Sequence, residues 1–533
     1  MSVYRVKQMN NIKPCGKVSI FGAGIGGLTV AHYLTPYAES IDIYEKNSIA
    51  GGLARSEDIN KNECDTTEIS WRVYFHFYKN LFDMMKEIPS YDGQSVFSHL
   101  TKYHNIFIPD KSTFSLLTPY QKWKIATTFA LSKERLDSYD DIPWRTFIGT
   151  DTAEIPQWLG MDRFKGSTVS VQRIGFEQAL RKGNKEDYVL DNPTNKVWFD
   201  PWTKDLEKRG IRFHFNSPIT SISVEPNTKN IIGAMANQTE IKSDLYIVAL
   251  PIEVIANLIP TMVPLAKELS VLAKQIQVAF QFHIETVGNK VISFGNRNGN
   301  PYNSFLIRNS PWALIIESKT ISWITNSTCK TNQWSITACQ ANVPGILIKK
   351  PLIYCTEDEA VSEIIAQLIN DSSLIKYLQN ENPDMDIVSL VKSAKWTNKK
   401  EITISTYKFN NNGLQTDEPK FSNNTTTKRL RPHIYLGPNA FLATAYTSET
   451  IDIFSMEAAT ISGKLVAATI MKQLGHPNIK FPELPERPFP ILNVFREADR
   501  ILFLNDLPDI ITFLMIIIIF IIVIYIIYKF IIV

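Results

Sequence analysis

The chain has 533 residues, of which 44% are hydrophobic and 20% are charged, and its formal net charge is +3. This composition excludes a disordered or collagen-like chain and predicts two or more domains. The near balance of acidic and basic residues gives no basic field, so we expect no nucleic-acid partner. Five cysteines without a CxxC pair predict neither a disulfide scaffold nor a metal site.

The first 17 residues carry basic side chains but no apolar stretch, so they do not resemble a secretory signal. The sequence KVSIFG then predicts a short strand, and LTVAHYL, a few residues later, has helical spacing. IDIYEK predicts a second strand that ends in an acidic residue. Together these segments predict a strand–turn–helix–strand unit over residues 17–45.

The turn of this unit contains the pattern G-x-G-x-x-G, formed by Gly22, Gly24 and Gly27, with Gly26 beside the last of them. In such a turn the first glycine permits the tight bend, the second lets a pyrophosphate approach, and the last lets helix and strand pack closely. The helix N-terminus faces the phosphates, and Glu45 accepts hydrogen bonds from the ribose hydroxyls. The segment therefore predicts dinucleotide binding.

The residues after Glu45 indicate which dinucleotide is bound. Gly51 and Gly52 allow a second backbone turn against phosphate, and Arg55 offers a fork of donors to its oxygens. Here the sequence resembles the flavin-containing amine oxidase and phytoene desaturase superfamily, in which such a segment wraps the FAD pyrophosphate. The resemblance implies an FAD-dependent oxidoreductase.

Three further segments are similar to that superfamily. Glu68, Trp71 and Arg72 match a segment that lies against the flavin in a desaturase-like subgroup, which implies that they line the active site. The segments LDNPT and WFDPW, within residues 190–202, match the same subgroup. Ile219 corresponds to an apolar residue at the adenine end, and DLYIVALP matches a strand of the family.

Near the C-terminus, the strand ending in Gly437 and the helix beginning near Met456 are similar to the family's last FAD-binding segment. The resemblance implies that the N-terminus of this helix points at the flavin ring, where its dipole would stabilise negative charge. The family usually has an acid after the glycine, but this chain has Pro438. Asn439 or Asp452 is the expected substitute.

The expected fold is α/β: a discontinuous Rossmann-like FAD-binding domain, an inserted α+β substrate domain and a C-terminal transmembrane helix. We expect the FAD-binding domain to consist of residues 15–90, 190–255 and 428–475. We expect residues 91–189 and 256–427 to form the substrate domain. Residues 476–509, which are rich in proline, are predicted to form a linker.

Residues 510–528 are apolar without a charge, which is close to the length that a helix needs to cross a bilayer. We expect a single-pass tail anchor, the only membrane attachment of the protein, with the body facing the cytosol. Arg487, Arg496 and Arg500 precede the segment, whereas only Lys529 follows it, which agrees with this orientation.

Flavin carries the redox chemistry, so the sequence need not contain a catalytic triad, and we assign no catalytic residue. His76 is either an active-site residue or, as we favour, part of an aromatic-rich helix face. Glu68 and Arg72 are either an ordinary i,i+4 ion pair or a pair beside the flavin. Many amine oxidases place a lysine near flavin N5; Lys395 and Lys399 are the nearest candidates by position, although surface lysines are the favoured interpretation.

No cysteine follows Cys355. Because some amine oxidases join FAD to a cysteine near the C-terminal helix, the resemblance here implies noncovalent FAD. Three functions remain open, in this order. The first is oxidation or desaturation of a lipophilic substrate by hydride transfer to flavin at a membrane. The second is a flavin amine oxidase that uses oxygen and releases peroxide, and the third is a non-enzymatic flavoprotein. The expected partners are a small lipophilic or amine substrate and a lipid bilayer.

Overall fold

The structure is a computed structural model that describes residues 15–58, 66–68, 72–109, 113–149, 154–178, 186–285, 290–323, 331–396, 407–410, 413–476 and 480–531. Its contacts divide the chain into two compact units. Unit 1 consists of the described residues of Met1–Asp110, Asn184–Ser422 and Leu430–Leu484. Unit 2 consists of those of Lys111–Gly183, Asn423–Arg429 and Pro485–Val533.

A six-stranded sheet in the order β24-β25-β12-β1-β2-β8 forms the first layer of unit 1. Neighbouring strands are parallel except β24 and β25. Its strands are β1 (Lys17–Phe21), β2 (Ser40–Tyr44), β8 (Arg212–His214), β12 (Leu245–Val248), β24 (Tyr435–Gly437) and β25 (Ala440–Leu442). The central β1 is buried after its first residue, as expected of a parallel strand that is covered on both faces.

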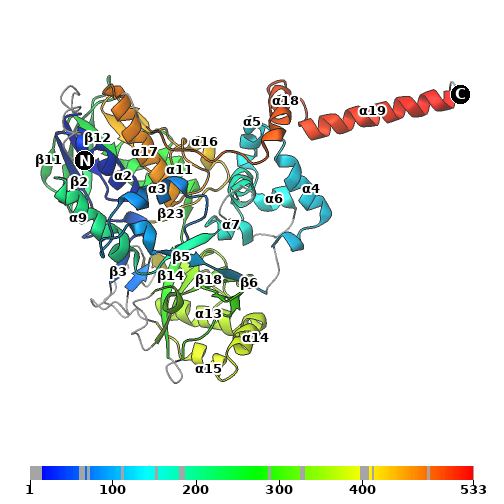
Figure 1. Ribbon diagram of the computed structural model, residues 1–533, viewed down its shortest axis with the longest axis horizontal. Helices are drawn as coiled ribbons and strands as arrows, with labels where there is room; N and C mark the ends of the chain where they lie inside the picture. Colours follow the sequence, from blue (N-terminus) through cyan, green and yellow to red (C-terminus); the bar gives the residue numbers. More distant parts are fainter. Residues whose placement is uncertain are drawn as a thin grey trace. The chain divides into compact units, whose positions relative to one another are not determined.

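Two helices, α2 (Ile25–Leu34) and α17 (Met456–Gln473), pack against each other beside this sheet (Figure 1). Helix α2 starts directly after Gly24, so that Gly26 and Gly27 lie in its first turn, and β2 ends at the residue before Glu45. The predicted strand–turn–helix–strand unit is therefore confirmed. The strands of the sheet come from three distant parts of the chain, which are the parts that the sequence predicts for nucleotide binding.

A three-stranded antiparallel sheet in the order β11-β10-β9 accompanies the parallel sheet. Its strands are β9 (Ile219–Val224), β10 (Ile231–Ala236) and β11 (Thr239–Ile241). A buried cluster joins Phe21 and Val248 of the parallel sheet to Ala234 of β10 and to helices α10 (Ile252–Leu258) and α11 (Ala266–Leu272).

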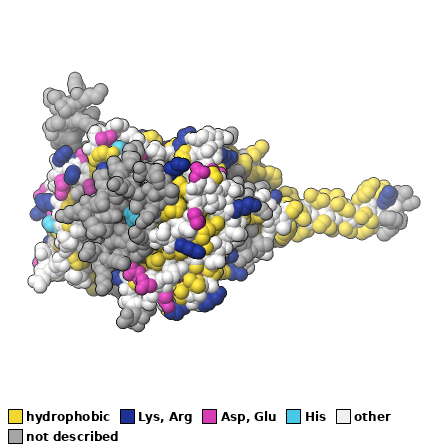
Figure 2. Space-filling view, turned by 90° about the horizontal axis from the view of Figure 1, so that it is seen from below, with side chains coloured by type: hydrophobic (Ala, Val, Ile, Leu, Met, Phe, Trp, Pro, Cys, Tyr) yellow, Lys and Arg dark blue, Asp and Glu magenta, His cyan; other side chains and the backbone are white. Residues whose placement is uncertain are grey.

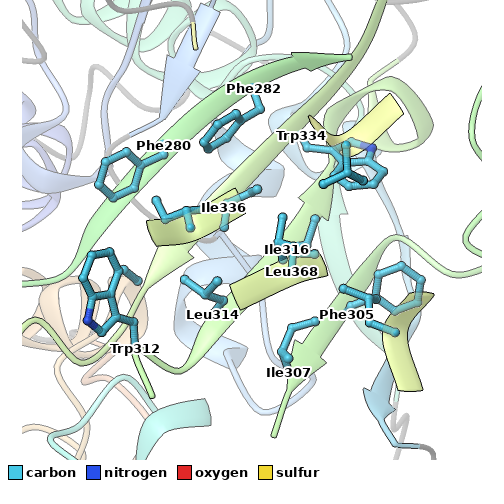
Figure 3. Close-up of a cluster of buried hydrophobic side chains, with 14 of the residues drawn as sticks. Phe280, Phe282, Phe305, Ile307, Trp312, Leu314, Ile316, Trp334, Ile336 and Leu368 are labelled. Atoms are coloured by element: carbon cyan, nitrogen blue, oxygen red, sulfur yellow. The ribbon is translucent and has the colours of Figure 1, made fainter. Parts of the chain in front are cut away.

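The second large sheet of unit 1 has six strands in the order β20-β14-β19-β18-β17-β6. These are β6 (Asn105–Ile108), β14 (Val278–Glu285), β17 (Ser304–Ile307), β18 (Leu314–Ser318), β19 (Thr331–Ala338) and β20 (Lys395–Trp396). Helices α13 (Glu357–Asn370), α14 (Ser372–Glu381) and α15 (Ile387–Lys392) supply apolar side chains to its core. Figure 3 shows Phe280, Ile316, Trp334 and Ile336 of the sheet gathered with Leu368 of α13.

Unit 1 contains further short elements. They are β3 (Ser56–Asp58), β4 (Thr66–Glu68), α3 (Lys79–Glu87), β5 (Leu100–Tyr103), β7 (Asp187–Leu190), α9 (Asp200–Lys208), β13 (Lys274–Gln275), β15 (Asn296–Arg297), β16 (Asn300–Pro301), α12 (Lys319–Ser322), β21 (Lys408–Asn410), β22 (Gly413–Gln415) and β23 (Lys420–Phe421). A π-helical turn over Asn195–Phe199 leads into α9.

Unit 2 is mainly helical. Its helices are α4 (Pro119–Thr128), α5 (Lys133–Asp137), α6 (Trp144–Ile148), α7 (Glu154–Trp158), α8 (Thr168–Ser170) with a π-helix over Val171–Gln178, α16 (Thr427–Leu430, which ends in the first residue of the next unit 1 segment), α18 (Asn493–Leu504) and α19 (Ile510–Ile531). Residues 510–529 of α19 have a mean hydropathy of 3.5 and only 6% of them are buried. The apolar helix predicted for the tail is therefore present, with the length and composition needed to cross a membrane.

The predicted linker is only partly extended. Residues 481–488 have no helix or strand, as expected for a proline-rich stretch, but residues 493–504 form α18. This helix forms because its Arg496 and Asp499 make buried hydrogen bonds to other parts of unit 2, a tertiary effect that local composition does not reveal. The division into an FAD-binding and a substrate domain remains a proposal.

Candidate functional site

Three of the four glycines in the first turn are required by close packing within the protein. A Cβ at Gly22 would lie 2.5 Å from the carbonyl oxygen of Ala249. A Cβ at Gly26 would overlap the carbonyl oxygen of Ala443, and one at Gly27 would overlap that of Gly22. These glycines therefore bring β1, α2 and the strand ends together.

Gly24 is different, because no atom of the described residues other than its chain neighbours lies within 4 Å of a Cβ built at this position. It is the N-cap of α2, with φ of −77°, and no side chain caps the helix there. Neither the backbone conformation nor the packing at Gly24 requires a glycine. The lack of a side chain there therefore leaves space for a group outside the chain. The uncapped N–H groups and the dipole of α2 favour an anion in that space.

Glu45 follows β2 and lies against this turn. One carboxylate oxygen accepts a hydrogen bond from the Ala23 backbone at 2.8 Å, and the other accepts from the backbone and side chain of Asn47 at 2.9 and 2.8 Å. Burial raises the pKa of Glu45. Each carboxylate oxygen has two lone pairs, so Oε2, which accepts only from Ala23, retains one position to accept from a ribose hydroxyl.

The second glycine pair, Gly51 and Gly52, packs against the glycine turn that precedes α2. The Gly51 N–H donates to the Ala23 carbonyl at 2.9 Å, and a Cβ at Gly52 would be 3.2 Å from the Gly24 Cα. Both glycines have positive φ, of +119° and +55°, a region that other residues rarely adopt. The two predicted glycine segments therefore form one continuous backbone cradle.

Arg55 is fully buried and supports this cradle from within. It donates to Glu57 at 2.7 Å, to the Gly52 carbonyl at 2.9 Å and to Glu418 at 2.9 Å. Burial opposes its charge, but Glu418 and Glu57 outweigh that effect and raise its pKa. These contacts orient Arg55 in the second glycine segment, and its predicted contact with phosphate remains a prediction.

A buried ion cluster lies beside the cradle. Lys319, the first residue of α12, places its Nζ 2.9 Å from Glu68 and 3.0 Å from Glu317. The three side chains are at most 2% exposed. Glu68 also accepts a short hydrogen bond from the Thr194 hydroxyl. Lys319 is 4.7 Å from the ring centre of Trp323, so its ammonium faces an aromatic surface as well.

With Arg72 included, the cluster contains two acidic and two basic side chains. Burial favours the neutral acid at Glu68, but Lys319 and Arg72 outweigh it and lower its pKa. Burial dominates at Glu317 and raises its pKa. At Lys319 burial opposes the charge, but both carboxylates outweigh it and raise the pKa. Lys319 is therefore held as an ammonium.

Arg72 connects the cluster to the cradle. Its guanidinium donates to the Leu53 carbonyl at 2.6 Å, in the second glycine segment. Glu68 lies in strand β4 and forms an ion pair with Lys319, and the position of Glu68 and Arg72 beside the flavin remains a prediction. Trp71 lies outside the described residues.

The remaining predicted cofactor contacts lie in unit 1 at the ends of its strands. Ile219 begins β9, and the Ser217 N–H just before it donates to the Glu45 carbonyl at 2.8 Å. Gly437 ends β24, where a Cβ would overlap the Lys229 carbonyl. Met456 begins α17. The side chain of the N-cap residue Ser455 accepts a hydrogen bond from the Ala458 N–H, in the first turn of this helix.

The two expected substitutes for the family's acid make other contacts. Asn439 accepts from the Ile231 N–H and donates to the Ile231 carbonyl, each at 2.9 Å. Asp452 forms a buried ion pair with Arg431. In the structure Asn439 therefore joins β25 to β10, and its expected role in ribityl binding remains a prediction.

His76 is not on a helix, contrary to the favoured interpretation. It lies in a turn before α3, because Tyr74 is held in a bridge to Tyr188. Its ring Nδ1 is 3.0 Å from Asp187. Of the two lysine candidates, Lys395 is in β20, where its side chain is not described, and Lys399 lies outside the described residues.

Like Lys319, Lys420 on β23 is a buried lysine that the sequence pattern did not predict. Its ammonium donates to Gln277 Oε1 at 2.6 Å, and Gln277 in turn donates to Cys339 Sγ at 3.0 Å. Burial lowers the pKa of Lys420 to about 8. This lysine is therefore able to exchange a proton near neutral pH.

The N-terminal turn of α17 is held by Glu457, which accepts hydrogen bonds from the backbone and side chain of Asn80 at 3.1 and 2.8 Å and from the Leu81 N–H at 2.7 Å. Burial raises the pKa of Glu457 from 4.5 to about 7. The folded protein therefore holds a proton here that the unfolded chain loses above pH 4.5.

We expect this group to make the protein less stable as the pH rises from about 4.5 to 7, by on the order of 3 kcal/mol. Glu457→Gln, which imitates the neutral acid, should reduce the pH dependence. Thermal unfolding of both proteins at pH 5 and pH 8 measures this. An equal loss of midpoint in the two proteins would contradict the expectation.

The family model for an NAD(P)-binding Rossmann-like domain matches residues 20–88. A 15-cis-phytoene desaturase of Synechococcus elongatus is 22% identical over 287 residues, which are 46% of this chain and 60% of the desaturase. A prenylcysteine oxidase 1-like protein of Homo sapiens is 39% identical over 61 residues, 11% of this chain and 12% of that protein. The chain thus spans less than two thirds of the length of these relatives.

Among solved structures, a putrescine oxidase bound to putrescine has a TM-score of 0.54 and 11% identity, covering 86% of this chain and 99% of that chain. An oxidoreductase from Methanosarcina mazei has a TM-score of 0.52 and 12% identity, covering 86% of this chain and 100% of that chain. At these identities the likeness concerns the fold alone.

Proposed function

We propose that this chain, a member of the flavin-containing amine oxidase and phytoene desaturase superfamily, is a membrane-anchored FAD-dependent oxidoreductase that oxidises or desaturates a lipophilic substrate. The observation that carries the proposal is the double glycine cradle. Gly24 leaves open space at the N-terminus of α2, and Glu45 is fixed beside it.

The residues present fit FAD. In the proposed complex the pyrophosphate lies against Gly24 and the Gly51–Gly52 turn, and Glu45 binds the adenosine ribose. Ile219 contacts the adenine end. The N-terminus of α17 at Met456 faces the flavin ring, where its partial positive charge stabilises negative charge on the ring.

FAD, when bound, supplies the acceptor for a hydride. The side chains have supporting roles. Lys319 is fixed as an ammonium between Glu68 and Glu317, so it orients polar groups in a low-dielectric site without itself losing charge.

The substrate class follows from two features that act together. The sequence relatives include desaturases of carotenoids, and the apolar helix α19 would keep the protein at a membrane where lipophilic molecules gather. A second candidate, a flavin amine oxidase, is favoured by the likeness of the fold to a putrescine oxidase.

Anaerobic titration of the purified protein distinguishes these functions. We expect a carotenoid precursor or another polyene lipid to bleach the flavin absorption, and putrescine and other primary amines to leave it unchanged. Bleaching by amines together with release of peroxide in air would favour the second candidate. A flavin that no substrate of either class reduces would contradict both.

We expect the flavin to be held without a covalent bond. The three described cysteines, Cys15, Cys339 and Cys355, lie outside the last FAD-binding segment, and no cysteine follows Cys355 in the sequence. Precipitation with trichloroacetic acid should therefore release all flavin into the supernatant. Flavin that remains with the washed pellet would refute noncovalent binding.

We further propose that α19 is the integral membrane anchor and that the body faces the cytosol. Removal of residues 510–533 should convert a protein that resists carbonate extraction into one that carbonate releases. An upstream segment of this length and hydropathy is absent among the described residues, so a truncated protein that still resists carbonate would contradict the proposal.

A further inference from the structure

Helix α18, which precedes α19, buries two charged side chains and exposes large apolar ones. Its buried side chains are Arg496 and Asp499, whereas Val494, Ile501 and Leu504 are 77%, 62% and 63% exposed. A helix on the surface of a water-soluble domain normally buries its apolar stripe and exposes its charges. This one buries two charged side chains and leaves Val494, Ile501 and Leu504 largely exposed, although Glu497 and Arg500 are exposed as well.

The buried polar face is fully engaged within unit 2, so the orientation of α18 is fixed. Arg496 donates to the carbonyl oxygens of Phe129 at 2.9 Å and of Pro488 at 2.6 Å. Asp499 accepts from the Ser132 N–H at 2.7 Å and from Arg135 at 2.9 Å. Rotating the helix to hide its apolar side chains would leave these groups without partners, at a cost that disfavours the rotation.

The outward face follows helical spacing. Val494, Ala498 and Ile501 are four and three residues apart, and Leu504 extends the same side. Ile491, just before the helix, is 82% exposed. Glu497 also lies on this side, and its carboxylate is 4.0 Å from Arg500. The face is therefore an apolar stripe whose single acidic side chain has a nearby basic partner.

The same buried aspartate fixes the start of α19. Asp499 Oδ1 accepts from the Ile510 N–H at 3.0 Å, and Arg135 donates to the carbonyl oxygens of Leu507 and Pro508 at 3.0 and 3.2 Å. The connection between the two helices is thus hydrogen-bonded to unit 2 rather than free. Whatever surrounds α19 is therefore brought next to α18. Figure 2 shows hydrophobic side chains along the exposed surface of α19.

We propose that α18 lies in the membrane–water interface, with Val494, Ile501 and Leu504 at the level of the lipid headgroups and upper acyl chains. The partner is the same bilayer that α19 would cross, and this inference rests on that part of the proposed function. Amphipathic helices of this kind lie in the membrane plane, where the apolar face leaves water and charged side chains reach back to it. Unit 2 then meets the membrane at two places, not through the tail alone.

The test uses the full chain in phosphatidylcholine nanodiscs, with the photo-crosslinking residue p-benzoylphenylalanine introduced at one position at a time. The positions are Ile501 in α18, Ile518 in α19 and, as a matched control, Ile232, an isoleucine of β10 that is 57% exposed. All three are exposed, so the substitution disturbs no core. Mass spectrometry then measures the fraction of each protein that carries a covalently attached lipid.

We expect lipid attachment at Ile501 and Ile518 to exceed that at Ile232 at least tenfold. Attachment at Ile518 with only the control level at Ile501 would overturn the interfacial helix and leave the tail anchor intact. Only the control level at both positions would overturn both, while the flavin absorption would still report on the redox part of the proposed function. Crosslinking of Ile501 to a second protein chain in place of lipid would also overturn the inference.

Discussion

Replacing Gly24 by alanine should lower the affinity for FAD at least about tenfold, a loss of about 1.4 kcal/mol or more. The flavin-free protein should lose no more than about 1 kcal/mol of stability, because Gly24 is the N-cap of α2 and alanine is a poorer cap than glycine. The reason for the lower affinity is the open space at this position. Among the described residues, a Cβ at Gly24 meets no atom beyond its chain neighbours within 4 Å, and the backbone φ of −77° suits any residue. The new methyl group would therefore collide with the pyrophosphate and not with the protein.

Gly233→Ala is the matched control, because a Cβ there meets only the Ile241 carbonyl at an ordinary 3.4 Å. Flavin content and FAD titration of the flavin-free proteins measure the first effect, and thermal unfolding measures the second. If Gly24→Ala bound FAD as the parent does, the cradle would not hold the pyrophosphate. If the flavin-free variant lost much more stability than the cap effect of about 1 kcal/mol, Gly24 would have a packing role like that of its neighbours.

Replacing Lys319 by methionine should lower the free energy of unfolding by about 3–5 kcal/mol, because it leaves two buried carboxylates side by side without their shared cation. Glu68 and Glu317 are both at most 2% exposed, so solvent does not compensate. Lys267→Met, which changes an exposed lysine on α11, should have little effect. Chemical denaturation of the detergent-solubilised proteins measures the difference.

The double variant Glu317→Gln with Lys319→Met separates stability from function. It removes one carboxylate together with the lysine and keeps Glu68 near Arg72, so much of the lost stability should return. If Lys319 also orients groups during the reaction, the rate of flavin reduction by substrate should stay at least about tenfold low, a barrier increase of about 1.4 kcal/mol. Recovery of the rate with the stability would reduce Lys319 to a structural residue.

The nucleotide-binding half of the fold was predictable from sequence because its signals are local. The glycines, the helical spacing after them and the acid at the end of the second strand all fall within residues 17–45. Each of these has a fixed structural consequence, so β1, α2 and β2 appear where the pattern places them. Gly52, which completes the cradle with Gly24, lies only seven residues after Glu45 and belongs to the second glycine pair.

The ion cluster was not predictable in the same way. Lys319 and Glu68 are 251 residues apart, and no local pattern indicates that they meet. The one available signal was two charged residues, Glu317 and Lys319, at the end of the apolar run LII in β18. Charges in that position need a partner, but only the arrangement of the second sheet identifies it.

The tail region shows a similar limit. Composition identified the apolar segment of α19, because an uncharged run of this length matches the thickness of a bilayer and is costly to expose to water. The prolines before it concealed α18, whose burial of Arg496 and Asp499 depends on residues more than 360 positions earlier in the sequence. From the sequence, Arg496 and Asp499 would be expected to face solvent, but in α18 these two residues face inward.

The most direct test of the central claim is the absorption spectrum of the detergent-purified full chain, together with the flavin content after acid release. The account predicts the bands of oxidised flavin and FAD approaching one molecule per chain. A colourless protein that takes up no FAD when the cofactor is added would contradict it.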